Sequence, residues 1–153
     1  MNKFFYFIFI YLFSTQLFAN EDIMILKLKY GDVKIEFFSD KAPNHVKRFK
    51  ILANSNQYDG VVFHRVIDGF MAQTGDVKFG NSLNDEYDLA KAGTGGSNLP
   101  NLKSEFTDVA HLRGILSMAR SPDPNSANSQ FFICLADAPH LDRNYTAFGR
   151  VID

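Results

Sequence analysis

The sequence predicts a mainly β fold, in which short antiparallel strands form a barrel or a sandwich with one helix. Segments with alternating apolar and polar residues recur along the chain, turn-forming residues separate them, and only one segment shows clear helical periodicity. The length of 153 residues fits one globular domain that can bury a sizeable core.

The first strand is predicted from alternation that starts at Asp22. Met24, Leu26, Leu28 and Tyr30 fall on one face, with Lys27 and Lys29 on the other, which is typical of a half-buried strand. Gly31 and Asp32 then have the composition of a two-residue turn, and residues 33–37 alternate again. These segments predict a β-hairpin.

A helix is predicted directly after this hairpin. Asp40 is a candidate N-terminal cap, Pro43 suits a first helical turn, and residues 54–60 contain the signals that end the helix. The residues expected on its buried face recur at a spacing of three to four. They are Ala42, Val46, Phe49 and Ala53.

The later strands are predicted from runs of β-branched and aromatic residues between turn signals. They span residues 61–67, 70–73, 114–119, 130–135 and 145–152. Residues 75–100 are rich in Gly, Asn and Asp without periodicity, which predicts a long functional or mobile loop region. In a strand over 61–67, His64 and Arg65 would face opposite sides, so we expect at most one of them in a given cavity.

Residues 1–19 have the pattern of a secretory signal peptide: Lys3, an apolar run over residues 4–13, and Ala19 before the expected cleavage point. The apolar run is about half of the ~20 residues that a membrane-spanning helix needs, so a permanent anchor is the less favoured alternative. We expect an exported, periplasmic protein with no stable membrane association after cleavage. Its functional domain would then span residues 20–153.

The charge and the cysteine content argue against a nucleic-acid-binding protein, a disulfide-stabilised fold and a cysteine nucleophile. The net charge is −1 and the basic residues are scattered, so we expect no nucleic-acid partner. Cys134 is the only cysteine, so no intramolecular disulfide can form. It lies in the apolar run 131–135, which predicts a buried and inert thiol.

The usual catalytic motifs are also missing from the sequence. The four histidines are far apart and never have the spacing of metal ligands, so we expect no metal. No Gly-x-Ser-x-Gly motif of a serine hydrolase occurs. Residues 93–96 (GTGG) lack the Lys-Ser/Thr of a phosphate-binding loop, so a flexible turn is the better interpretation.

Three segments combine bulky apolar residues with isolated Arg or Gln residues. They are residues 63–67 (FHRVI), 69–73 (GFMAQ) and 125–133 (NSANSQFFI). Taken singly, each is most simply a core strand with polar residues on its solvent-facing positions.

With these segments, and with GTGG (93–96), GILSMAR (114–120) and YTAFGRV (145–151) in the same order, the sequence resembles a cyclophilin. The resemblance covers essentially all of residues 22–153. It implies an eight-stranded antiparallel barrel capped by helices. Cyclophilins continue beyond the segment that matches YTAFGRV, so we expect a fragment that lacks the C-terminal helix and the closing strand.

The resemblance implies a peptidyl-prolyl cis/trans isomerase that acts on proline-containing unfolded polypeptides, as a monomer and without a cofactor. Arg65 matches the catalytic arginine of the family. The substrate-binding positions match Phe70, Met71, Phe132 and Leu141 as the apolar wall for the proline ring, Gln73 and Gln130 as polar contacts, and Ala119, His140 and Tyr145 as neighbouring subsites.

Departures from the family pattern leave part of the site open. His140 and Tyr145 replace a common Trp and a common His, as in bacterial relatives, which puts cyclosporin affinity in doubt. Arg120 replaces a common Asn, where we expect little effect because the backbone makes the substrate contact. Two alternatives remain: a non-catalytic chaperone that holds proline-containing segments, and a carrier of a small apolar ligand, which the many Phe residues disfavour.

Overall fold

The computed structural model describes residues 22–153. The predicted signal peptide, residues 1–19, lies outside the described residues. The elements in chain order are β1 (Ile23–Leu28), β2 (Gly31–Phe37), α1 (Pro43–Asn54), β3 (Arg65–Ile67), β4 (Met71–Thr74), β5 (Ile115–Met118), β6 (Phe131–Cys134), the short 3₁₀ helix η1 (Pro139–Leu141) and β7 (Ala147–Val151).

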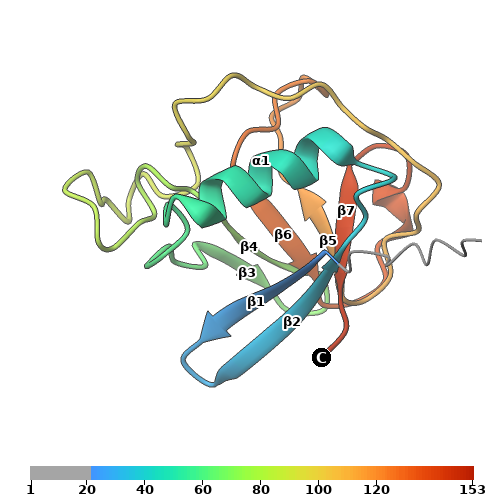
Figure 1. The fold of residues 1–153 in the computed structure, drawn as a ribbon, viewed down its shortest axis with the longest axis horizontal. Helices are drawn as coiled ribbons and strands as arrows, with labels where there is room; N and C mark the ends of the chain where they lie inside the picture. Colours follow the sequence, from blue (N-terminus) through green and yellow to red (C-terminus); the bar gives the residue numbers. More distant parts are fainter. Residues whose placement is uncertain (1–21) are drawn as a thin grey trace, which may run out of the picture.

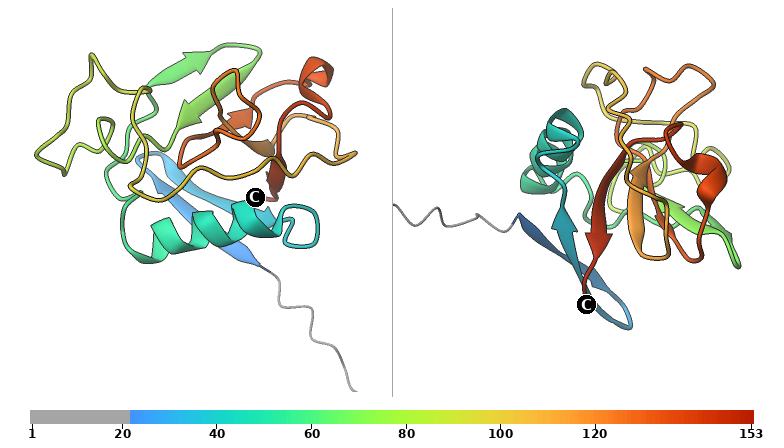
Figure 2. Two further views of the ribbon diagram at one scale, coloured as in Figure 1. Left: turned by 90° about the horizontal axis from the view of Figure 1, so that it is seen from above. Right: turned by 90° about the vertical axis from the view of Figure 1, so that its right-hand side faces the viewer.

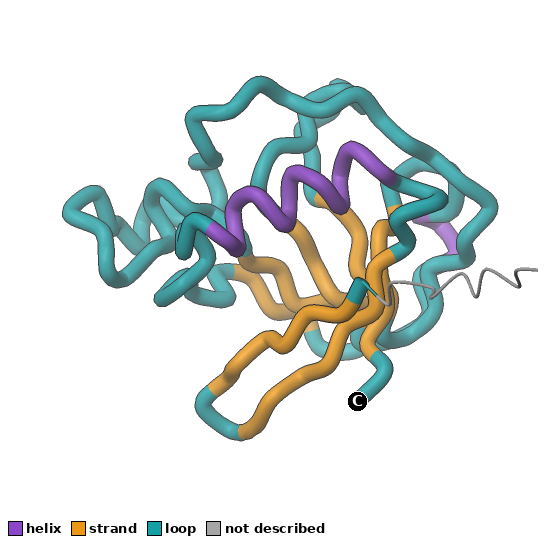
Figure 3. Tube along the Cα trace, viewed as in Figure 1, coloured by secondary structure: helices purple, strands orange, loops and turns teal. Residues whose placement is uncertain are grey.

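The strands form one sheet in the order β1-β2-β7-β5-β6-β4-β3, and each neighbouring pair is antiparallel. The sheet curls into a half-barrel, and α1 runs across it (Figures 1 and 3). The prediction of a mainly antiparallel β fold is therefore confirmed. Within residues 22–153 the sheet has seven strands, with β1 and β3 at its edges.

The first hairpin forms, but its turn lies two residues earlier than predicted. Leu28 pairs with Gly31, so Lys29 and Tyr30 form the turn, and Gly31 is the first residue of β2. The lysine and tyrosine continue the alternating pattern of β1, which hides the turn in the sequence. Gly31 has a φ of 143°, a value that favours glycine, where the chain leaves the turn.

The helix α1 begins at Pro43 as predicted, but Asp40 does not cap it. The cap position is Ala42, which supplies no side-chain hydrogen bond. The carboxylate of Glu105 accepts hydrogen bonds from the backbone N–H groups of Asn44 and His45, each at 3.1 Å. A cap from a distant loop leaves no local signal, which is why the prediction failed.

The buried face of α1 agrees with the predicted stripe at three of its four positions. Ala42, Val46 and Phe49 are buried, and Ala53 is half-buried. Leu52 is buried as well, so the face is wider than the stripe.

The predicted strand over residues 61–67 is shorter in the structure. Only Arg65–Ile67 pairs with β4. Val61 forms an isolated bridge with Asn81, and the Val62 N–H donates to the Gly80 carbonyl. The segment before Arg65 thus pairs with the long loop, and its β-branched residues do not extend the ladder.

Aromatic rings fill the space between α1 and the sheet. The Phe49 ring centroid lies 4.7 Å from that of Tyr58, 4.9 Å from Phe131 and 5.4 Å from both Phe37 and Phe148. Such contacts add to the free energy gained by burying apolar area. These rings therefore form a large part of the core cluster under α1.

Cys134 lies on the other face of the sheet and is buried, as predicted. Burial raises the pKa of its thiol to about 11. No helix within residues 22–153 has the length and apolar character to cross a membrane.

Candidate active site

A cavity of about 690 Å³, called here the main cavity, opens on the face of the sheet opposite α1. Phe131 packs into the core under α1, whereas the next residue, Phe132, faces this cavity, because side chains alternate along a strand. The right-hand view of Figure 2 shows α1 and η1 on opposite sides of the sheet. The main cavity is lined by His64, Arg65, Phe70, Met71, Gln73, Ala92, Gly93, Thr94, Ala119, Arg120, Phe132, His140, Leu141 and Tyr145.

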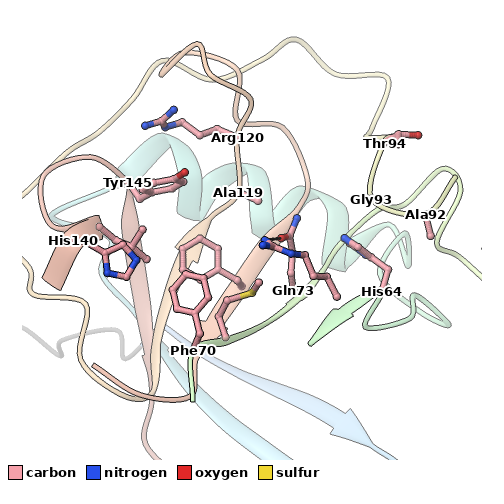
Figure 4. A pocket seen from close by; sticks show the side chains of 14 residues that line it. His64, Phe70, Gln73, Ala92, Gly93, Thr94, Ala119, Arg120, His140 and Tyr145 are labelled. Carbon is pink, nitrogen blue, oxygen red and sulfur yellow. Dashed lines mark hydrogen bonds between the residues drawn. The ribbon is translucent and has the colours of Figure 1, made fainter. Parts of the chain in front are cut away.

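The structure brings together the residues that the sequence analysis singled out. Nine of the ten line the main cavity, from Arg65 on β3 to Tyr145 before β7 (Figure 4). The tenth, Gln130, lines a neighbouring cavity and accepts a hydrogen bond from Gln73 at 2.9 Å. No local spacing in the sequence could have indicated this convergence.

The floor of the main cavity is apolar. Met71, Phe132 and Leu141 are almost completely buried and pack in one cluster. The Phe132 ring meets Tyr145 edge-on at 5.9 Å between centroids, and the Phe70 ring lies 5.4 Å from His140. This wall can receive a compact apolar group and exclude water from it.

The polar side of the cavity is a chain of side-chain hydrogen bonds. Arg65 Nη1 donates to Gln73 Oε1 at 3.4 Å, and Gln73 Nε2 donates to Gln130 Oε1 at 2.9 Å. Gln130 Nε2 donates in turn to the carbonyls of Gly93 and Gly95, at 3.0 and 2.7 Å. The exposed guanidinium of Arg65 is thereby linked to the long loop.

Asp76 holds this loop in place and was missed by the sequence analysis. Its carboxylate is fully buried and accepts four backbone N–H groups at 2.7 to 3.1 Å. Burial opposes ionisation, but these bonds keep the pKa of Asp76 below its usual value. The donors are the backbone N–H groups of Lys78, Phe79, Gly93 and Gly95.

Glycine is required at two positions of the loop around Asp76. A Cβ on Gly95 would lie 2.6 Å from Asp76 Oδ1, and Gly93 has a φ of 98° and packs against the His64 ring. The GTGG segment therefore packs closely around the Asp76 carboxylate. The N–H groups of Gly93 and Gly95 are already bonded to Asp76, which agrees with the prediction that this segment is not a phosphate loop.

His64 and Arg65 both line the main cavity, so the prediction that at most one of them could do so is wrong. His64 precedes β3, where strand alternation does not apply. Burial lowers the pKa of His64 despite the nearby Asp76 carboxylate. No group of three or more His, Cys, Asp or Glu residues in the described part of the chain could hold a metal ion.

The family model described as "Cyclophilin type peptidyl-prolyl cis-trans isomerase/CLD" matches residues 23–153. A protein of Brucella abortus called a probable peptidyl-prolyl cis-trans isomerase is 55% identical over 132 residues, which are 86% of this chain and 67% of that protein. The human peptidyl-prolyl cis-trans isomerase-like 3 is 40% identical over 127 residues, 80% of this chain and 71% of that protein.

Solved structures give the same result. The crystal structure of a cyclophilin type isomerase of Cryptosporidium parvum, obtained in the presence of the dipeptide Ala-Pro, has a TM-score of 0.69 and 35% identity, and covers 82% of this chain and 75% of that one. A cyclophilin from Hirschia baltica has a TM-score of 0.71 and 26% identity, and covers 87% and 64%. The chain therefore belongs to the cyclophilin-type peptidyl-prolyl cis-trans isomerase family.

Proposed function

We propose that this isomerase accelerates rotation about Xaa–Pro bonds in unfolded or extended protein segments, and that Arg65 is its catalytic residue. The observation that carries the proposal is the position of the Arg65 guanidinium at the edge of an apolar wall, in a cavity with no carboxylate among its lining residues. A cation in such a place can act on a neutral peptide group instead of being neutralised by an ion pair.

The reaction requires a catalyst that binds a twisted amide. Rotation about the bond has a barrier of roughly 18–20 kcal/mol because amide resonance is lost, and no covalent bond breaks. As the bond twists, the prolyl nitrogen becomes pyramidal and regains a lone pair. A guanidinium N–H can donate to that lone pair only in the twisted state, so the bond stabilises the transition state selectively.

One hydrogen bond does not account for the whole rate enhancement. An uncatalysed rate of about 0.01 per second must rise to an ordinary turnover of ~10–1,000 per second, which takes roughly 4–7 kcal/mol. A hydrogen bond from a charged donor contributes about 1.5–3 kcal/mol. The wall of Phe70, Met71, Phe132 and Leu141 would supply the rest by holding the proline ring away from water and fixing the flanking backbone.

The C. parvum relative supports a proline-containing substrate. Its crystal structure was obtained in the presence of Ala-Pro, and it is 35% identical to this chain over most of its length. The apolar wall described above suits a pyrrolidine ring, and the chain of glutamines beside it offers partners for peptide groups.

A coupled isomerase assay on a proline tetrapeptide tests this function. We expect activity, and we expect Arg65→Ala to lower kcat/KM at least tenfold while peptide affinity stays within a few-fold. Arg113→Ala is the matched control, because Arg113 is exposed and lies outside the cavity. Unchanged catalysis in Arg65→Ala would contradict the catalytic role of Arg65. Peptide binding without isomerase activity in the wild-type protein would favour the non-catalytic chaperone.

We also propose export to the periplasm, with residues 1–19 removed. The charge and apolar pattern of those residues supports this, and the first described strand begins at Ile23. Expression of the full chain in a bacterium, fractionation and mass spectrometry of the N-terminus would test it. A mature protein that starts at Asn20 in the periplasmic fraction is expected, and an intact Met1 in the cytoplasmic fraction would overturn it.

A further inference from the structure

Arg120 lies where the main cavity meets its neighbour. The neighbouring cavity, called here the side cavity, has a volume of about 420 Å³ and is walled by the GTGG segment and by polar side chains such as Asn128 and Gln130. Arg120 lines both cavities. A peptide with a proline in the main cavity would therefore place a flanking residue near this guanidinium.

The Arg120 guanidinium is held in a fixed orientation. Nε and Nη2 both donate to the Asn144 carbonyl, at 3.2 and 2.9 Å. Nη1 donates to the carbonyls of Ser121 and Pro122, at 3.0 and 3.2 Å. The group also stacks on the Tyr145 ring, 4.4 Å from its centroid, above the cavity in Figure 4.

These contacts leave donor capacity for a ligand. A guanidinium has five N–H groups, and the four bonds to backbone carbonyls leave one on Nη2. Because the orientation of Arg120 is already fixed, this side chain would lose little conformational entropy when a ligand binds. All of its partners are neutral, so its positive charge stays uncompensated.

The charged residues that line the two cavities are positive. No Asp or Glu lines either of them, and within residues 22–153 neither Arg65 nor Arg120 takes part in an ion pair. The whole chain, in contrast, has a net charge of −1. The positive charge at the site is thus local and faces the place where substrate would bind.

We propose that Arg120 gives this isomerase a preference for proline segments that carry Asp or Glu close to the proline. The inference rests on the proposed function, because it concerns the substrates of the same cavity. It revises the expectation that Arg120 has little effect. From the usual strength of a partly exposed Arg–carboxylate pair, we expect kcat/KM to be about three- to fivefold higher for an acidic peptide than for its neutral counterpart.

Matched peptides test the preference. The set contains proline tetrapeptides with Glu or its neutral isostere Gln at the residue before the proline, two before it, or after it. We expect a Glu/Gln ratio of kcat/KM of about three to five for at least one position. Because the pair is partly exposed, the ratio should fall toward one as NaCl is raised to 1 M.

Variants assign the preference to Arg120. Arg120→Gln should bring the Glu/Gln ratio to about one, and Arg120→Lys should restore part of it because it keeps the charge. Arg113→Gln removes the same charge outside both cavities and should leave the ratio unchanged. The ratio within each variant is compared, so a change in folded fraction does not affect the result.

Two failures can be told apart. If the Gln peptides are isomerised but every Glu/Gln ratio stays within twofold of one, or if Arg120→Gln keeps the wild-type ratio, the preference is overturned and the isomerase function stands. If no peptide in the set is isomerised, the proposed function fails first, and the preference falls with it.

Discussion

Arg65 and Gln73 are paired across β3 and β4, and the Arg65 Nη1 donates to the Gln73 Oε1 at 3.4 Å. Gln73 is in turn fixed by Gln130, whose amide is fixed by two glycine carbonyls. The guanidinium therefore takes its orientation from a series of amides that ends at the backbone of the long loop.

Replacing Gln73 by leucine should slow catalysis. The variant keeps the approximate volume of the side chain but removes the acceptor for Arg65, so the guanidinium samples more orientations. We expect kcat/KM for a proline tetrapeptide to fall about three- to tenfold, as for one long hydrogen bond to a charged group. Gln57→Leu, outside the main cavity, is the control. Wild-type activity in Gln73→Leu would show that Arg65 needs no partner.

Asp76→Asn should destabilise the fold. An amide has one acceptor oxygen where the carboxylate uses two, and it places an N–H₂ group against backbone donors. We expect a loss of about 2–4 kcal/mol in the free energy of unfolding, measured by urea denaturation. Asp40→Asn, on an exposed side chain, should change it by less than about 0.5 kcal/mol. Equal effects in the two variants would contradict the role of the Asp76 carboxylate in holding the loop.

Glu105→Gln should weaken α1. The wild-type carboxylate accepts from two backbone N–H groups at the helix start and from His45 Nδ1 at 2.6 Å. Burial opposes its ionisation, but these bonds keep the pKa of Glu105 below the usual range. We expect a loss of about 1–3 kcal/mol in unfolding free energy. Glu36→Gln, which removes an exposed pair with Arg150, should cost less than about 1 kcal/mol.

The fold should become less stable as the pH falls from 7 to 5. Burial lowers the pKa of His45, His64 and His111 in the folded protein. A histidine of this kind binds a proton more readily when unfolded, so its contribution is complete above its unfolded pKa of about 6.5 and is lost as the pH falls toward the folded value. Urea denaturation at pH 5, 6 and 7 measures the effect. Higher stability at pH 5 than at pH 7 would contradict it.

Cys134 should be unreactive in the folded protein. Its side chain is 1% exposed, so a reagent can hardly reach the sulfur. Burial also raises the pKa of the thiol to about 11, so little reactive thiolate is present at neutral pH. We expect a disulfide reagent such as DTNB to label it at least a hundredfold more slowly in buffer than in 8 M urea. Rapid labelling in buffer, with the near-UV CD of the folded state retained, would show that the thiol is accessible.

Local patterns in the sequence predicted most of the strands well. The segments 114–119 and 130–135 became β5 and β6 with one residue trimmed at each end, because alternation and β-branched residues are properties of the strand itself. The turn after β1 and the start of β3 were misplaced. At both places the pairing partner decides the boundary, and the partner of residues 61–62 is the long loop.

The site was predicted through the family resemblance and not from periodicity. Arg65 and Tyr145 are eighty positions apart in the sequence, and only the curl of the sheet places them in one cavity. Asp76 received no role from the sequence, because its partners are backbone groups that no sequence pattern shows. The environment of Arg120 also depends on the Asn144 carbonyl, which belongs to another segment.

The carboxylate at the start of α1 comes from a residue 60 positions later in the chain than His45. During biosynthesis at ~5–20 residues per second, Glu105 leaves the ribosome about 3–12 seconds after His45 does. A helix of 12 residues is marginal in isolation. We therefore expect the start of the helix to fray until Glu105 has been synthesised. The hydrogen bonds from Glu105 then fix the residue at which the helix begins.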